Sequence, residues 1–108
     1  MDYKAKILIV DDRPENLVVL ERIFKEIDAT FIKAGNGNDA LKQTLHHDFA
    51  LAILDIRMPG MDGYELAELL RAEKKTEHLP IIFLTAVYSG ETHIFQGYQS
   101  GAVDFISK

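Results

Sequence analysis

The fold of this chain is constrained most by a set of short apolar runs in which hydrophobic and polar residues mostly do not alternate. Strands without alternation are covered on both faces, as in a parallel sheet that lies between two layers of helices. We therefore predict a buried parallel sheet. Its strands are expected at "AKILIV" (Ala5–Val10), the weaker run "TFIKA" (Thr30–Ala34), "LAIL" (Leu51–Leu54), "IIFL" (Ile81–Leu84) and "AVDFI" (Ala102–Ile106).

Segments with helical periodicity separate these runs. Over Pro14–Asp28, apolar residues recur at spacings of three and four, and the proline itself suits a first helical turn. Weaker helices are expected over Asn38–His46 and over Glu91–Ser100. The apolar face of the first helix consists of Leu17, Leu20, Phe24 and Ile27.

A further helix is predicted in the segment "MDGYELAELLRAEKK". Asp62 is followed three residues later by Glu65, which resembles a capping box at the start of a helix. Leu66, Leu69 and Leu70 form the predicted buried stripe of this helix.

The resulting order of elements is a repeated β-α unit that ends on a fifth strand. Strands that alternate with short helices imply right-handed crossovers and an open, doubly wound α/β sheet. In such sheets, ligands bind beyond the carboxyl ends of the strands, where the strand order reverses. The polar residues that follow the predicted strands are therefore candidates for a functional site.

The composition fits one compact domain and excludes several kinds of partner. The chain has 108 residues, of which 47% are hydrophobic and 27% are charged. A net charge of -5 argues against a broad surface for nucleic acid or for an anionic membrane. No apolar run approaches the roughly 20 residues of a membrane-spanning helix, and the absence of cysteine excludes disulfides. We expect a cytoplasmic domain that binds neither membrane nor nucleic acid directly.

Chemically active residues follow most of the predicted strands, namely Asp11, Asp12, Asp55, Thr85 and Lys108. If the strand order is 2-1-3-4-5, the first and third strands are neighbours and the three carboxylates converge. Carboxylates that repel one another are commonly neutralised by a hard cation such as Mg2+. A carboxylate can also attack phosphorus and form an acyl phosphate. In this interpretation Lys108 and Thr85 bind a phosphoryl group carried by Asp55.

Four segments, "ILIVDD", "LAILDIRMPGMDGYEL", "IIFLTA" and "GAVDFISK", resemble the receiver domain of two-component response regulators. The resemblance covers essentially the whole chain and rests on five separated residues, each in the expected strand context. It implies a flavodoxin-like, five-stranded sheet with the order 2-1-3-4-5. It also implies that a sensor histidine kinase or a histidine phosphotransfer protein donates a phosphoryl group from its phosphohistidine. The domain would catalyse its own phosphorylation and dephosphorylation rather than turn over as an enzyme.

The resemblance also implies roles for individual residues. Asp55 is the expected phosphoacceptor. Asp11 and Asp12 hold Mg2+ directly or through water, and the main-chain carbonyl of Arg57 completes the metal site.

Thr85 and Phe105 resemble the switch pair of this family, which shifts when phosphate binds and so controls an output. Receivers ordinarily continue from the lysine into proline and a fifth helix, whereas this sequence stops at Lys108. We therefore expect residues 1–108 to be a receiver domain, apparently lacking the fifth helix, from a longer response regulator or hybrid kinase with an output domain. One face of the sheet would then be covered by the helix over Pro14–Asp28 alone, which predicts self-association through that face.

Other interpretations remain open at this point. Asp11 or Asp12 could cap the helix that begins near Pro14, and Phe105 could be an ordinary core aromatic. The chain could be a receiver-like interaction module that is never phosphorylated, although such modules usually lose an acid, the threonine or the lysine. It could also be a Mg2+-dependent phosphohydrolase with an aspartyl nucleophile. Many of these enzymes carry a second acid two residues after the nucleophile, where this chain has Arg57.

Overall fold

The computed structural model describes residues 4–85 and 104–107, and the strands of this part form a five-stranded parallel sheet. The strands lie in the order β2-β1-β3-β4-β5. The predicted doubly wound, flavodoxin-like sheet and its strand order are confirmed. The strands are β1 (Ala5–Val10), β2 (Ala29–Ala34), β3 (Leu51–Asp55), β4 (Ile81–Thr85) and β5 (Asp104–Ser107).

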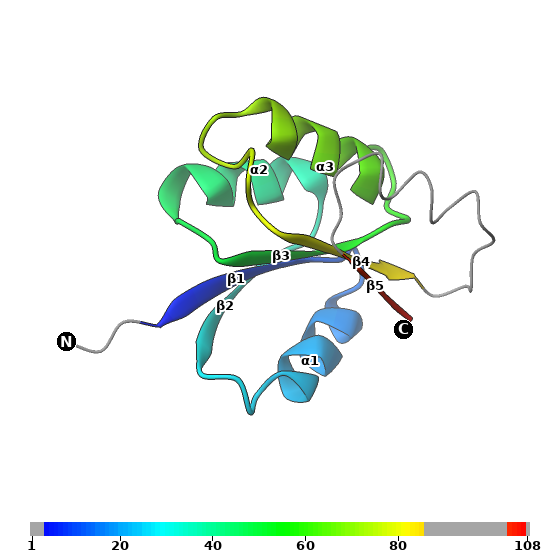
Figure 1. The fold of residues 1–108 in the computed structure, drawn as a ribbon. Coiled ribbons are helices and arrows are strands. Elements are labelled where there is room, and N and C mark those ends of the chain that lie inside the picture. Colours follow the sequence, from blue (N-terminus) through cyan, green and yellow to red (C-terminus); the bar gives the residue numbers. More distant parts are fainter. Residues whose placement is uncertain (1–3, 86–103, 108) are drawn as a thin grey trace.

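Three described helices pack on the two faces of this sheet. They are α1 (Pro14–Ile23), α2 (Gly37–His46) and α3 (Gly63–Ala72). Figure 1 shows α2 and α3 side by side on one face of the sheet and α1 on the other. This arrangement explains why the central strands lack alternation, because the last four residues of β1 and of β3 are all buried.

The core consists of two apolar clusters, one on each face of the sheet. Successive residues of β1 enter opposite clusters, because side chains alternate across a strand. Leu8 and Val10 pack with residues of α2 and α3, and Ile7 and Ile9 pack with Leu20 of α1. The central strands therefore hold the two layers together and fix the position of their own carboxyl ends.

The helix predicted over Pro14–Asp28 is shorter in the structure and ends at Ile23. Periodicity alone extended it, because Phe24 and Ile27 continue the apolar spacing. The chain needs the intervening residues to reverse direction and enter β2 at Ala29, and the Ile27 N–H donates to the Phe24 carbonyl in this turn at 2.9 Å. Ile27 is 48% exposed, so it does not belong to the buried face.

The buried stripe of α3 also differs from the prediction at one residue. Leu66 and Leu70 are buried, but Leu69 is 42% exposed. The face that contacts the sheet is completed by Tyr64 and Ala67 instead. These positions share one side of the helix at spacings of three and four, and Leu69 lies beyond the edge of that stripe.

Two remaining expectations concern the end of the chain. β5 begins at Asp104, later than the predicted Ala102. The helix expected over Glu91–Ser100 lies outside the described residues and stays a prediction. Within residues 4–85 and 104–107, no helix is long and apolar enough to cross a membrane.

Candidate functional site

Three carboxylates meet at the carboxyl edge of the sheet, where β1 and β3 end side by side. The parallel register pairs Val10 with Leu54, so the residues after β1 lie next to the end of β3. Asp11, Asp12 and Asp55 each contribute a carboxylate oxygen, and these oxygens all lie within 4.8 Å of one another. The structure thus brings together the three acids that the sequence placed at strand ends.

The three carboxylates differ in their access to solvent. Asp11 has 0% exposure and Asp55 has 4%, whereas Asp12 is exposed. Like charges this close repel one another, and burial removes water that would otherwise screen the repulsion. The cluster is therefore costly to assemble unless hydrogen-bond donors or a cation offset its charge. It runs from the core to the surface, so a ligand can reach it from the side of Asp12.

Among the described residues, the buried Asp11 carboxylate accepts hydrogen bonds from a main-chain N–H and from a side-chain amide. The main-chain N–H of Arg13 donates to Asp11 Oδ1 at 3.1 Å, and Nδ2 of Asn16 donates to Asp11 Oδ2 at 3.2 Å. The sequence indicated the acids but gave no role to Asn16. The sequence did contain a signal for Asn16. Its amide side chain lies in the first turn of the helix that follows the acidic pair Asp11 and Asp12.

Helix capping does not account for Asp11 or Asp12. The N-cap of α1 is Arg13, with extended backbone angles, and its side chain makes no capping bond to the described residues. A capping carboxylate would accept from the second or third amide of the helix. Asp11 instead accepts from the amide of the N-cap residue itself.

The loop from β3 to α3 is fixed by short contacts. The Gly63 N–H donates to the Ile56 carbonyl at 2.8 Å. The predicted capping box is present, since the Asp62 side chain accepts from the Glu65 N–H at 2.8 Å and Glu65 Oε1 accepts from the Asp62 N–H at 3.3 Å. Gly60 completes the turn with a φ of 80°, a conformation that favours glycine. These contacts hold the chain that follows Asp55 close to the end of β3.

The chemistry and spacing of the three acids fit Mg2+. This cation prefers oxygen ligands at about 2.1 Å in octahedral geometry, so neighbouring and opposite ligand oxygens lie about 3.0 and 4.2 Å apart. The carboxylate oxygens of Asp11, Asp12 and Asp55 all fall within 4.8 Å, which needs only a small contraction. The cluster supplies hard oxygen ligands without histidine or cysteine, which suits Mg2+ better than softer metals.

The other predicted site residues are placed less completely. Arg57 lies two residues beyond Asp55 and is exposed. Thr85 is the last residue of β4, and its neighbour Leu84 pairs with Asp55. The ends of β3 and β4 therefore lie at the same edge of the sheet. The side chains of Thr85 and Phe105, and the whole of Lys108, lie outside the described part of the chain.

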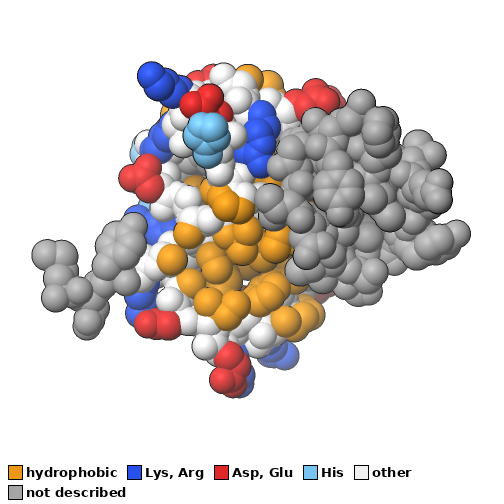
Figure 2. Space-filling model, viewed as in Figure 1, with side chains coloured by type: hydrophobic (Ala, Val, Ile, Leu, Met, Phe, Trp, Pro, Cys, Tyr) orange, Lys and Arg blue, Asp and Glu red, His pale blue; other side chains and the backbone are white. Residues whose placement is uncertain are grey.

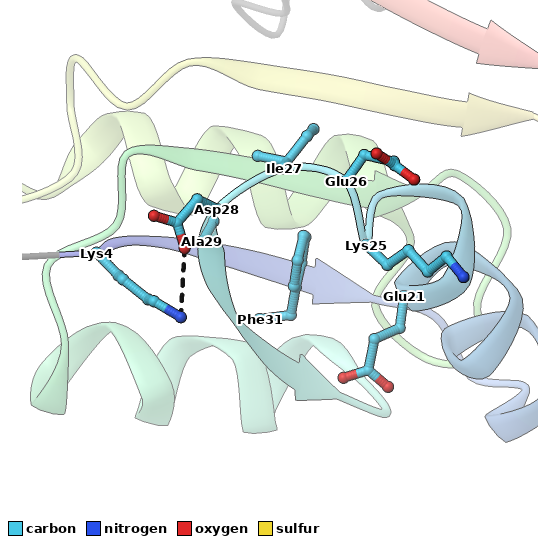
Figure 3. A pocket seen from close by; sticks show the side chains of 8 residues that line it. All are labelled: Lys4, Glu21, Lys25, Glu26, Ile27, Asp28, Ala29 and Phe31. Carbon is cyan, nitrogen blue, oxygen red and sulfur yellow. Dashed lines mark ion pairs between the residues drawn. The ribbon is translucent and has the colours of Figure 1, made fainter.

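A surface hollow lies elsewhere, at the amino edge of the sheet. Its lining includes Lys4 before β1, Ala29 at the start of β2, and Lys25 in the turn after α1. Figure 3 shows charges of both signs around it, among them the ion pair between Lys4 Nζ and Asp28 Oδ1 at 3.3 Å. Both partners of this pair are exposed, so the hollow lacks the buried charges that distinguish the acidic cluster.

Comparison with known proteins identifies the family of this chain. Residues 7–108 match the family model of the response regulator receiver domain. A probable cyclic di-GMP phosphodiesterase of Vibrio cholerae is 38% identical over 106 residues, which are 97% of this chain and 23% of that protein. The chain thus spans about a quarter of the length of this relative.

Two similar crystal structures contain magnesium. The receiver domain of the sensor histidine kinase PA1611 of Pseudomonas aeruginosa has the ion in its active-site cleft; it is 26% identical, with a TM-score of 0.85, over 98% of this chain and 86% of that one. TrrA of Thermotoga maritima, in complex with Mg2+ and BeF, is 35% identical, with a TM-score of 0.82, over 96% of this chain and 86% of that one. Sheet order, acidic cluster and sequence match agree, and the chain belongs to the response regulator receiver domain family, the phosphoacceptor domains of two-component signalling.

Proposed function

We propose that Asp55 is the phosphoacceptor of this receiver domain and that it takes its phosphoryl group from a phosphohistidine. The position of Asp55 carries the proposal. It ends the central strand β3, is 4% exposed, and has an oxygen within 4.8 Å of those of Asp11 and Asp12. A group of three close carboxylates is costly by itself and becomes favourable when a divalent cation is shared between the acids and phosphate oxygens.

In the proposed step, a carboxylate oxygen of Asp55 attacks the phosphorus in line with the P–N bond of the donor. The P–O bond forms as the P–N bond breaks. The imidazole nitrogen leaves with the bonding electron pair and takes up a proton. The product is an acyl phosphate, and water that later attacks its phosphorus releases phosphate and restores the Asp55 carboxylate. The domain thus accepts one phosphoryl group at a time.

Asp11, Asp12, Asp55 and the main-chain carbonyl of Arg57 are the proposed ligands of Mg2+. When bound, the ion would offset the negative charge of the phosphoryl oxygens beside these acids. The buried Asp11 is held by the Arg13 N–H and the Asn16 amide, whereas Asp12 is exposed at the mouth of the site. The mixture of one fixed and one accessible acid supports a site that admits a phosphodonor from solvent.

Further roles follow from the family. Lys108 and Thr85 would bind the phosphoryl oxygens, the lysine as a compact cation and the threonine as a hydroxyl donor. The placement of Thr85 at the end of β4, next to the strand of Asp55, supports its role. A joint shift of Thr85 and Phe105 would then report phosphorylation to an output.

The proposed partners are a sensor histidine kinase or a histidine phosphotransfer protein as donor, and an output domain as recipient of the signal. We place this exchange in the cytoplasm. The Vibrio cholerae relative supports a linked output domain, because the receiver accounts for 23% of its length.

Intact-mass measurement tests the proposal. With Mg2+ and a small phosphodonor or a phosphorylated histidine protein, the chain should gain the mass of one phosphoryl group. EDTA and the Asp55→Asn variant should each abolish the gain. Asp62→Asn is the matched control, because it removes one nearby carboxylate charge while asparagine remains a good N-cap for α3.

Three results would contradict the proposal. Equal labelling of the parent and of Asp55→Asn would assign the acceptor to another residue. Steady release of phosphate by a chain that never accumulates label would favour an aspartyl phosphohydrolase, and no uptake at all would favour an interaction module.

A further inference from the structure

Asn16 contacts the candidate metal site without belonging to the acidic cluster. Its Nδ2 donates to Asp11 Oδ2 at 3.2 Å from the first turn of α1. We propose that Asn16 is a positioning residue, which fixes the plane of the Asp11 carboxylate so that Asp11 can serve a metal of strict geometry. This inference rests on the proposed Mg2+ site and adds a residue that acts through one of its ligands.

The need for such a residue follows from the side-chain torsions of aspartate. The torsion that sets the carboxylate plane is broad and is not confined to sharp rotamers. At Asp11, the Arg13 N–H donates to one oxygen and the Asn16 amide donates to the other. Donors on both oxygens restrict rotation of the carboxylate plane, and the Asn16 amide contributes the contact to Oδ2.

The donor type also suits the electrostatics of the cluster. Asp11 has 0% exposure and lies beside two further carboxylates, so a donor to it offsets part of the repulsion before any cation binds. An aspartate at position 16 would add a fourth negative charge, and an apolar residue would offer no donor. A neutral amide supplies a donor without competing for the cation as an additional anion.

The local backbone separates this role from the folding of the helix. The Asn16 main-chain N–H donates to the Arg13 carbonyl at 3.0 Å, a bond that every non-proline residue at this position can make. The first turn of α1 therefore does not depend on the Asn16 side chain. Substitution at this position should chiefly affect the Asp11 carboxylate.

Metal selectivity provides the test, because Mg2+ demands near-ideal octahedral geometry whereas Ca2+ accepts flexible coordination. The dissociation constants of Mg2+ and Ca2+ would be measured by calorimetry for the parent, Asn16→Ala and Asn16→Gln. Loss of a residue that orients a metal ligand typically weakens affinity about 10-fold or more. We expect Asn16→Ala to weaken Mg2+ binding by about 10-fold and Ca2+ binding by clearly less, and Asn16→Gln, which keeps an amide donor, to recover part of the Mg2+ affinity.

Asn38→Ala is the matched control, because it makes the same change at an exposed residue in the first turn of α2. Asn38→Ala should leave the Mg2+ and Ca2+ affinities within about twofold of those of the parent, which is small beside the roughly 10-fold loss expected when a residue that orients a metal ligand is removed. Unfolding by urea without metal would be measured on the same variants. A loss of stability in Asn16→Ala with unchanged metal affinity, or an equal loss of Mg2+ and Ca2+ affinity, would overturn the positioning role.

The outcome for the parent separates the two proposals. If the parent does not bind Mg2+, the proposed metal site is wrong. If the parent binds Mg2+ and takes up a phosphoryl group on Asp55 while Asn16→Ala binds equally well, only the inference about Asn16 is wrong. If Asn16→Ala does not fold, Asn16→Gln provides the test. Glutamine displaces the amide from its place beside Asp11, so the ratio of the Mg2+ and Ca2+ affinities should change if the Asn16 amide orients Asp11, and an unchanged ratio would overturn the inference.

Discussion

Gly63 brings the start of α3 against the end of β3, the strand that carries Asp55. A Cβ at this position would lie 2.3 Å from the main-chain oxygen of Asp55 and 3.0 Å from the Cα of Ile56. Both obstacles are backbone atoms, which cannot move aside as the end of a side chain can. The missing side chain therefore allows the loop after Asp55 to close tightly.

Alanine substitutions at three glycines should give a graded series. Gly63→Ala is expected to destabilise the fold by about 1–3 kcal/mol through overpacking and to slow phosphoryl uptake by displacing Asp55. Gly37→Ala should cost less, because its Cβ would meet the flexible Met61 side chain, with the Sδ at 2.4 Å. Gly35→Ala should cost least, because no described atom lies within 4 Å. Urea midpoints and initial rates of labelling measure the series, and equal midpoints for all three variants would refute this account of Gly63.

The acids of the site could be predicted from the sequence, whereas their supporting residues could not. Asp11 and Asp12 follow the first apolar run and Asp55 follows the third, so the parallel-sheet rule brings all three to one edge. The strand order that makes the first and third strands neighbours was implied by the family resemblance. Asn16 and Gly63 act through a hydrogen bond and a close approach that depend on how α1 and α3 meet the sheet. Local sequence does not encode those distances.

At the scale of elements, the contact between α3 and β4 is an aromatic pair. The rings of Tyr64 and Phe83 meet edge to face, with centroids 4.9 Å apart and planes at 71°. Burial raises the pKa of the Tyr64 phenol above its ordinary value of 10.0, and the nearby charge of Asp62 raises this pKa further. The folded state thus favours the neutral phenol.

This pKa shift predicts a loss of stability at alkaline pH. As the pH rises above 10.0, the phenol of Tyr64 ionises in the unfolded chain before it ionises in the folded one. The contribution of the neutral phenol to the free energy of unfolding is complete below that pH and is lost as the pH rises through the higher pKa of the folded state. Tyr64→Phe keeps the ring and lacks this titration. The parent should therefore lose free energy of unfolding relative to Tyr64→Phe above about pH 10, in urea titrations at matched pH. Parallel pH profiles of the two proteins would contradict the assignment.

Element boundaries were predictable where a single signal sets them. β1 was predicted with its observed bounds because the apolar run starts and stops sharply, and the start of α3 follows from its capping box. The end of α1 could not be predicted in this way, because the apolar spacing continues to Ile27 although the chain is already turning toward β2. The connection to the next strand overrides helical periodicity there.

At the scale of the whole molecule, the two faces of the sheet are covered unequally by the described helices. Two helices cover one face, and α1 alone lies on the other (Figure 1). Hydrophobic side chains gather in the lower half of the view in Figure 2, the side of α1. The exposed large apolar residues of α1 and the turn after it are Val18, Val19, Ile23 and Ile27.

Such a concentration of apolar surface predicts self-association, because contiguous exposed patches of a few hundred Å2 commonly mark contact sites. Sedimentation should show the average mass of the 108-residue chain rising with concentration. Ile23→Lys should restore a monomer without loss of stability, since Ile23 is 62% exposed and a cation is favourable at the end of α1. Leu45→Lys is the matched control, because Leu45 is 73% exposed near the end of α2, on the opposite face. A parent that stays monomeric, or a control that dissociates as fully as Ile23→Lys, would show that α1 does not form the contact.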